Sequence, residues 1–107
     1  MSTSVTSFKD RTLFEETGIE IGTVRDVIHS PGDLQPEWIV VKTGWRRGEH
    51  LVPIEAVNAD GPNLTCAYDK QTVKDSPVVK AHVAPPRAQR RLTYAHYGLE
   101  VPEDRDN

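Results

Sequence analysis

The stretch that decides the fold is PEWIVVKTGWRRGEHLVP, residues 36–53. Its first half contains the apolar run WIVV at residues 38–41, and residues 51–52 (LV) continue the apolar pattern after a charged turn. Aromatic and β-branched side chains suit a pleated strand, and Gly44 and Gly48 at the two ends of the turn let the chain reverse. The stretch therefore predicts a β-hairpin, and we expect the rest of the chain to wrap around it.

The size and charge of the chain limit the classes of protein to which it can belong. It has 107 residues, 36% of them apolar, which is enough for one small domain with a modest core. Its 16 Asp and Glu residues outnumber its 13 Lys and Arg residues and give a formal net charge of −3. Nucleic-acid-binding domains are more often basic, so the charge balance argues against that class.

The sequence also predicts the compartment. Cys66 is the only cysteine, so an internal disulfide cannot form, and a lone thiol suits a reducing environment. Residues 1–12 are polar and lack the apolar centre of a signal peptide. No apolar run approaches the ~20 residues that span a bilayer. We therefore expect a cytoplasmic protein without a membrane anchor.

Residues before the hairpin show the alternation of a strand. In GIEIGTVRDVIHS, residues 18–30, apolar residues alternate with polar ones, but the phase shifts near Gly22. Such a shift predicts a β-bulge or a sharp bend. Residues 10–17 fit either one helical turn or an extended lead-in, and Leu13 and Phe14 are expected to cover one end of the core.

Shorter elements follow the hairpin. Pro53 lacks a backbone donor, so its strand ends there or lies at an edge. Residues 64–68 predict a fourth strand, residues 69–77 a helical turn with Asp69 as N-cap, and residues 78–79 a last strand-like segment. Short strands separated by Gly and Pro turns imply a small antiparallel barrel or sandwich.

A helix is predicted at residues 87–97, because Pro86 stands near its start and Gly98 suits the position after its end. Apolar residues recur along it at helical spacing. They are Ala88, Leu92, Ala95 and Leu99. An apolar stripe on an appended helix is expected to be buried, so Tyr94, Tyr97 and Leu99 could pack on the barrel or on a second copy of the chain.

Four segments in order resemble the PRC-barrel domain, a family named for the cytoplasmic domain of the photosynthetic reaction-centre H subunit. They are GIEIGTVRDVIHS (18–30), PEWIVVKTG (36–44), EHLVPIEAV (49–57) and DGPNLTCAYDKQTVKDSP (60–77). The most specific pieces are Ile-Gly-x-Val-x-Asp-Val at 21–27 and Val-Pro-Ile-Glu at 52–55. The ending LTYAHYGL (92–99) resembles the tail of stand-alone bacterial members.

The resemblance implies a mainly all-β fold, a small antiparallel PRC-type β-barrel with a short C-terminal α-helix. It implies the barrel at residues 13–83, after a flexible segment at 1–12, followed by a hinge and helix at 84–99 and a charged tail at 100–107. Members are mostly adaptors and not enzymes, so no catalytic residue or cofactor carries over. The positions that match the family's scaffold are Gly22, Asp26, Pro53, Glu55, Tyr68 and Asp69.

Side chains with reactive chemistry are few and scattered. Of the four histidines, only His29 and His50 could meet, if their strands end near each other, and a zinc site needs more ligands than two. Cys66 alternates with apolar neighbours and has no basic residue beside it, so we expect a buried, unreactive thiol. Asp26 interrupts an apolar strand and is expected to bond backbone donors or an arginine. We predict no metal site and no enzyme.

Two surfaces are candidates for binding a partner. Trp45, Arg46 and Arg47 lie at the tip of the hairpin, and Trp and Arg are enriched in interface hot spots. The second candidate surface comprises Leu92, Tyr94 and Tyr97 of the predicted helix. Helical spacing also places the arginines at 87, 90 and 91 on one face, as a possible basic cluster.

The sequence therefore predicts an adaptor or scaffold module that binds a protein of unidentified nature and forms a homodimer. The alternative is a factor associated with RNA or the ribosome, since a related barrel forms the C-terminal half of a bacterial ribosome-maturation factor. The salt dependence of binding distinguishes the two, because phosphate contacts weaken steeply as salt rises.

Overall fold

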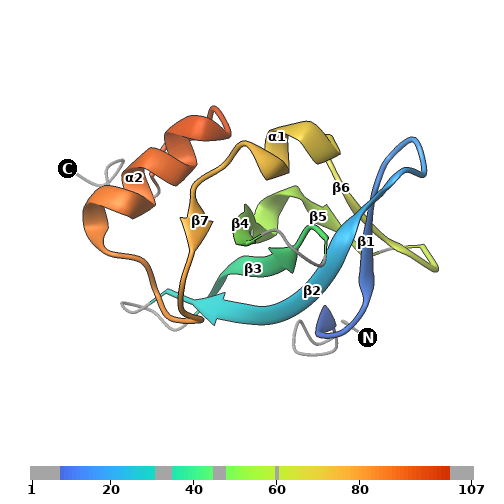
Figure 1. Ribbon diagram of the computed structural model, residues 1–107, viewed down its shortest axis with the longest axis horizontal. Coiled ribbons are helices and arrows are strands. Elements are labelled where there is room, and N and C mark those ends of the chain that lie inside the picture. The colour runs from blue at the N-terminus through green and yellow to red at the C-terminus, as the bar shows by residue number, and fades with distance from the viewer. Residues whose placement is uncertain (1–7, 31–34, 45–47, 60, 102–107) are drawn as a thin grey trace.

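The computed structural model describes residues 8–30, 35–44, 48–59 and 61–101. The sheet and the two helices enclose the core together (Figure 1). The strands are β1 (Thr12–Glu15), β2 (Glu20–His29), β3 (Pro36–Lys42), β4 (Glu49–Pro53), β5 (Val57–Asn58), β6 (Leu64–Cys66) and β7 (Val78–Val79). A 3-10 turn, η2 (Ile54–Ala56), follows β4, and the helices are α1 (Lys70–Lys74) and α2 (Arg87–His96).

The seven strands form one strongly curved sheet in the order β5-β6-β1-β2-β3-β4-β7. All neighbours are antiparallel except β1 and β6, which run parallel, with Leu13 opposite Leu64. Within the described residues the end strands β5 and β7 do not pair, so the barrel-like sheet stays open. The fold is therefore mainly all-β with a short C-terminal helix, as predicted, although the parallel pair was not foreseen.

The predicted bend in β2 is confirmed. The register between β1 and β2 shifts by one residue, because Leu13 lies opposite Gly22 whereas Phe14 lies opposite Glu20. A Cβ atom at Gly22 would approach the carbonyl oxygen of Lys42 to 2.2 Å, so a side chain there would clash with the backbone of β3. Of the two alternatives for residues 10–17, the extended one holds at residues 12–15, which form β1 between turn residues.

The central hairpin forms as predicted, and its register places Trp38 opposite Pro53 and Val40 opposite Leu51. Each of the four residues of the WIVV run is fully buried. Side chains of a strand alternate between its faces, so a continuous apolar run needs cover on both sides. The curved sheet supplies one cover, and α2 supplies the other (Figure 1).

Two apolar clusters result. The interior cluster lies inside the curved sheet and contains Phe8, Leu13, Ile21, Val24, Ile39, Val41, Val52, Leu64, Cys66 and Val73. The outer cluster lies between the other face of the sheet and α2 and contains Ile28, Trp38, Val40, Leu51, Val79 and Tyr94. Phe8 belongs to the interior cluster, so the chain already packs on the core within the segment 1–12 that was expected to be flexible.

The C-terminal third of the chain places both helices. The Asp69 carboxylate accepts a hydrogen bond from the Thr72 backbone N–H at 2.8 Å, which caps α1 as predicted and lowers the pKa of Asp69. Gly98 has φ 73° just after α2, in the left-handed region that favours glycine. Neither helix in the described part of the chain has the length and hydrophobicity that crossing a bilayer requires.

Candidate functional site

Helix α2 buries a face that is rich in polar atoms. Its buried residues are Arg90, Thr93 and Tyr94, and Tyr97 follows directly after it. The Arg90 side chain is 10% exposed and pairs with the Glu37 carboxylate, which is 7% exposed. Arg90 Nε donates to Glu37 Oε2 at 2.9 Å, and the Tyr94 hydroxyl donates to the same oxygen at 2.7 Å. This buried anchor fixes the rotation of α2 about its own axis.

The end of α2 is fixed by two more hydroxyl groups. The Tyr97 hydroxyl donates to the Leu51 carbonyl at 2.7 Å, and the Tyr68 hydroxyl donates to the Tyr97 carbonyl at 2.8 Å. The Tyr68 and Tyr97 ring centroids lie 4.6 Å apart. Burial raises the pKa of Tyr97, so its hydroxyl remains protonated and able to donate at neutral pH. Both tyrosines thereby hold the helix against the sheet.

The opposite face of α2 is exposed and is the leading candidate for an interaction surface. We define the α2 outer face as Arg87, Ala88, Arg91, Leu92 and Ala95, all exposed. The Leu92 residue is 64% exposed, among the largest exposures of any apolar residue in the described chain. Ala88, Leu92 and Ala95 therefore do not pack on the barrel, whereas Tyr94, Tyr97 and Leu99 do, which is one of the two alternatives that the sequence left open.

The physical reason lies in a second stripe at the same helical spacing, formed by Arg90, Thr93, Tyr94 and Tyr97. Tyrosine rings bury far more apolar area than alanines do. Tyr94 stacks against Trp38 with ring centroids 4.5 Å apart, and its hydroxyl still reaches Glu37. The barrel therefore binds the aromatic stripe, and Leu92 is left facing outwards.

The predicted partner-binding residues thus have different positions. Leu92 is available on the outer face, whereas Tyr94 and Tyr97 are 2% and 5% exposed and contribute to the fold of this chain. Trp45, Arg46 and Arg47 lie outside the described residues, so partner binding at the hairpin tip remains a prediction.

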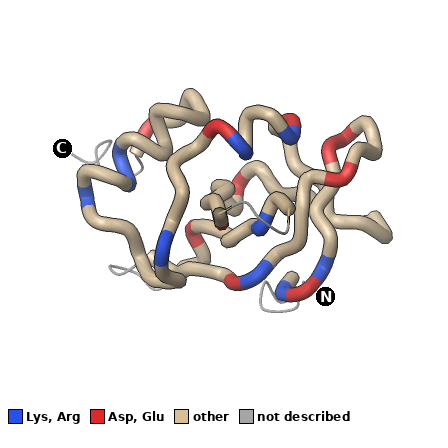
Figure 2. Tube along the Cα trace, in the orientation of Figure 1, with Lys and Arg blue, Asp and Glu red and all other residues tan. Residues whose placement is uncertain are grey.

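The basic cluster expected on α2 is smaller than predicted. Arg90 points inwards to Glu37, which leaves Arg87 and Arg91 on the outer face. Figure 2 shows basic residues along α2, while acidic residues gather at the turn between β1 and β2 on the far side of the molecule. The α2 outer face therefore combines an apolar centre with two guanidinium groups.

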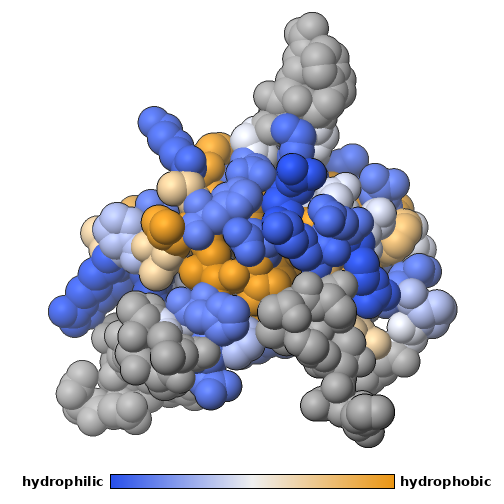
Figure 3. Space-filling model, turned by 90° about the horizontal axis from the view of Figure 1, so that it is seen from below, coloured by the Kyte–Doolittle hydropathy of each residue, from blue (hydrophilic) through white to orange (hydrophobic). Residues whose placement is uncertain are grey.

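Another exposed apolar area borders β7. Val78 and Val83 are 52% and 65% exposed, and with Pro85, Pro86 and neighbours they line a groove of about 280 Å³. On the face seen from below, Figure 3 shows apolar areas among mostly hydrophilic side chains. However, β7 has two residues, so it offers little edge for pairing with a strand.

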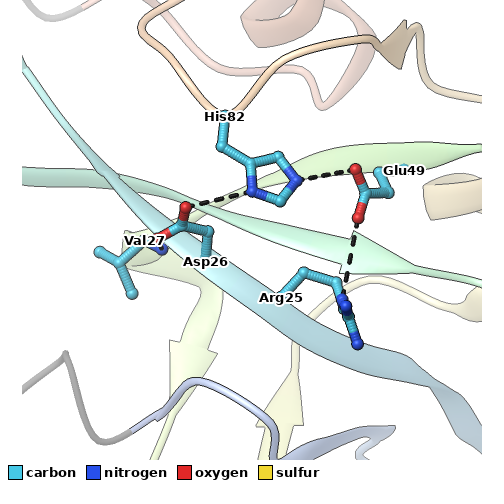
Figure 4. Close-up of polar contacts among 5 residues, drawn as sticks. All are labelled: Arg25, Asp26, Val27, Glu49 and His82. Carbon is cyan, nitrogen blue, oxygen red and sulfur yellow. Dashed lines mark hydrogen bonds and ion pairs between the residues drawn. The ribbon is translucent and has the colours of Figure 1, made fainter.

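Asp26 is held within the fold, but its partner is not an arginine. One carboxylate oxygen accepts the Val27 backbone N–H at 2.8 Å, and the other lies 3.1 Å from His82 Nδ1. His82 Nε2 lies 2.8 Å from Glu49, whose other oxygen is 3.9 Å from Arg25 (Figure 4). His82 therefore ties the loop after β7 to both β2 and β4.

Two further histidines and the cysteine were singled out in the sequence. His29 pairs with Pro36 at one end of β2, whereas His50 lies opposite Val41, so the two histidines do not meet. His50 Nδ1 is buried and lies 3.0 Å from the Ser76 carbonyl. In the described residues no three metal-ligating side chains converge. Burial raises the pKa of Cys66 to about 11, so the thiol is protonated at neutral pH, as expected of an unreactive cysteine.

Sequence reasoning missed the anchor of Glu37, Arg90 and Tyr94. The signal was a carboxylate directly before the apolar run of residues 38–41 within β3, which needs a partner when the strand is buried on both faces. It also missed the link from Asp26 through His82 to Glu49, because these residues come from three separate segments. No local spacing in the sequence indicates that contact.

Comparison with known proteins agrees with this architecture. The family model described as PRC-barrel domain matches residues 3–73, whereas a search of curated proteins gave no match. PRC-barrel domains are generally non-catalytic modules of protein interaction. Because the match covers well over half of the residues, the chain belongs to the PRC-barrel domain family.

Proposed function

We propose that this chain is a non-catalytic adaptor that docks a partner protein through the α2 outer face. The observation that carries the proposal is the 64% exposure of Leu92 on a helix whose opposite face is locked to the barrel. An exposed leucine alone is ordinary. Here it stands between Ala88 and Ala95, so a partner surface can approach the helix backbone closely around it.

The rigidity of α2 supports this role. A buried ion pair contributes little net stability, because desolvation of both charges offsets their attraction. Its effect here is to specify one rotation of the helix, since Glu37 accepts from both Arg90 and Tyr94. A pre-oriented surface loses less conformational entropy on binding than a mobile one. The anchor therefore prepares the outer face for docking.

The charges on the α2 outer face define the partner's chemistry. Arg87 and Arg91 lie one turn apart on the same side of Leu92, so the best complement is an apolar hollow with carboxylates along one edge. Binding to RNA fits less well, because Arg90 forms an ion pair with Glu37 inside the fold and the chain carries a net charge of −3. Cytoplasmic location and a homodimer remain part of the proposal, with the second copy as one form of the partner.

The test uses Leu92→Glu, with Val83→Glu as the matched control, because the two residues are 64% and 65% exposed on different surfaces. Tagged full-length protein is recovered from its own cells with and without ribonuclease, and the bound proteins are identified. The proposal expects a partner that survives ribonuclease, is retained by Val83→Glu and is lost with Leu92→Glu. Loss of a hot-spot contact of about 2 kcal/mol weakens affinity roughly 30-fold.

Three results would contradict the proposal. One is a partner retained by Leu92→Glu, and another is equal loss in both variants. The third is recovery of RNA-linked components that disappear with ribonuclease. Light scattering of the purified chain tests for self-association. If the wild type has the mass of a dimer and Leu92→Glu has the mass of a monomer, the partner is a second copy of the chain.

A further inference from the structure

A pocket of about 320 Å³ opens between the end of β3, the start of β2 and the start of α1. Its walls bring together residues that are distant in the sequence. They include Glu20, Gly22, Thr23, Lys42, Thr43 and Lys70. Helix α2 contributes no residue to the described lining, so the pocket is separate from the α2 outer face.

Both lysines of the pocket lack an acidic partner among the described residues. Lys42 lies opposite Glu49 in the β3–β4 register, but no ion pair joins the two in the described structure, where Glu49 contacts His82 and Arg25. Near Lys70, Glu15 contacts the backbone of that lysine and a threonine. Oε2 accepts the Lys70 backbone N–H at 2.8 Å, and Oε1 accepts the Thr17 hydroxyl at 2.9 Å. Both lysines have intermediate exposure, and Glu20 is the only carboxylate in the described lining.

A hydroxyl donor accompanies the two lysines. Thr43 is 5% exposed, and its Oγ1 atom has no hydrogen-bond partner in the described structure. Buried polar atoms are rarely left unpaired, and an unpaired one costs free energy. The neighbouring backbone is fixed, because Gly22 packs on the Lys42 carbonyl with no room for a side chain. The described lining thus offers two lysine side chains beside a fixed backbone, with the Thr43 hydroxyl buried within the wall.

We propose that this pocket binds a phosphate-sized oxyanion, either free or as the terminal group of a larger ligand. Lysine binds phosphate as a point charge, and charge-assisted hydrogen bonds are stronger than neutral ones. The anion would neutralise Lys42 and Lys70, and a rotation of the Thr43 side chain would let Oγ1, which is unpaired in the described structure, donate to it. Glu20 at the rim opposes the anion. This site is independent of the proposed adaptor function.

The test is a titration of the ¹⁵N-labelled full chain with sodium phosphate at pH 7, compared with sodium chloride at matched ionic strength. We expect saturable shifts of the backbone amides of Gly22, Thr43 and Lys70 with phosphate alone. Lys42→Ala and Lys70→Ala should each weaken binding at least tenfold. Lys80→Ala, which removes the same charge outside this pocket, should bind as the wild type does, and Glu20→Gln should bind more tightly.

Three outcomes would overturn the site. They are equal shifts with chloride, shifts that never saturate, and equal weakening by Lys80→Ala. Unchanged spectra of the Lys42→Ala and Lys70→Ala variants away from the pocket confirm that both remain folded. Repeating the titration with a phosphate monoester such as adenosine monophosphate shows whether the pocket prefers free phosphate or the phosphate group of a larger ligand. Equal affinity supports a site for the free anion, and tighter binding supports one for a larger phosphorylated ligand.

Discussion

The two apolar clusters on either side of β3 are stabilised in different ways. The interior cluster is built from apolar side chains such as Ile39 and Val41 and includes one buried thiol, Cys66. The outer cluster, with Trp38 and Val40 on the alternate face, is closed by a helix that brings a buried charge pair and a tyrosine hydroxyl. The same four-residue run thus supports both kinds of packing.

The difference teaches what each kind of packing specifies. Apolar contacts are non-directional, so they bury area without fixing one orientation. Hydrogen bonds to a buried carboxylate are directional, and a wrong rotation of α2 would leave Glu37 unpaired at high cost. The interior cluster therefore provides the driving force for folding, and the outer cluster determines which face of α2 meets solvent.

The largest expected effect comes from breaking the anchor. Arg90→Ala leaves the Glu37 carboxylate buried without its charge partner, which should cost about 3–5 kcal/mol in unfolding free energy. Urea unfolding of the full chain measures the loss. The triple variant Glu37→Leu, Arg90→Met and Tyr94→Phe removes every polar member together and should recover most of the stability. If it is as unstable as Arg90→Ala, the anchor does not act as a unit.

The next largest effect is expected at high pH, where each cluster loses stability through a different ionisable group. Burial raises the pKa of Cys66 from 9.0 to about 11 and also raises the pKa of Tyr94. The folded chain therefore holds these protons more tightly than the unfolded chain, so stability is complete below pH 9 and falls as pH rises through 11. Cys66 alone accounts for about 2–3 kcal/mol. Unfolding free energies measured from pH 8 to 11.5 test this. Cys66→Ala should remove the part of the stability loss that begins near pH 9, and the same pH dependence in the variant would show that Cys66 does not cause it.

A matched pair of smaller changes compares the packing directly. Ile39→Val removes one methylene from the interior cluster and Ile28→Val removes one from the outer cluster, where the two isoleucines are 0% and 4% exposed. Each should cost about 0.5–1.5 kcal/mol. We expect Ile39→Val to lie at the upper end, because the curved sheet relaxes less than a helix on its surface. Thermal unfolding of both variants measures the two losses of stability. A larger loss for Ile28→Val would mean that the outer cluster is the less able of the two to relax.

The smallest effect is expected at the α2 outer face. Leu92→Ala should change the unfolding free energy by no more than about 0.5 kcal/mol, because Leu92 is 64% exposed. The same substitution at the fully buried Leu64 should cost about 2–5 kcal/mol. Urea unfolding distinguishes the two. A large loss at Leu92 in the isolated chain would mean that the leucine is buried in solution, as in a self-associated form.

Local patterns predicted the elements near the hairpin well. Alternation in β2, the shift at Gly22, the N-cap at Asp69 and the helix boundary at Gly98 all appear in the structure. Each depends on contacts between residues close in sequence or on backbone geometry that one residue type favours. The parallel pairing of β1 with β6 was not predictable in this way, because it joins segments about fifty residues apart.

The orientation of α2 shows why the candidate surface was predicted only in part. The helix carries two stripes at helical spacing, one with Ala88, Leu92 and Ala95 and one with Arg90, Tyr94 and Tyr97. Hydropathy favours burial of the first stripe. The second is buried because its aromatic rings cover Trp38 and Tyr68 and its polar atoms find Glu37 and the Leu51 carbonyl.

The sequence by itself determined the mainly β fold, the hairpin at its centre, the positions of both helices and the membership of the family. These follow from periodicity, turn residues and short motifs, which are properties of neighbouring residues. Only the tertiary structure decided which face of α2 is exposed, which carboxylates are engaged and where Lys42 and Lys70 lie without an acidic partner among the described residues. Those features depend on partners supplied by distant segments, because a buried charge or hydroxyl is stable only where the fold brings its complement.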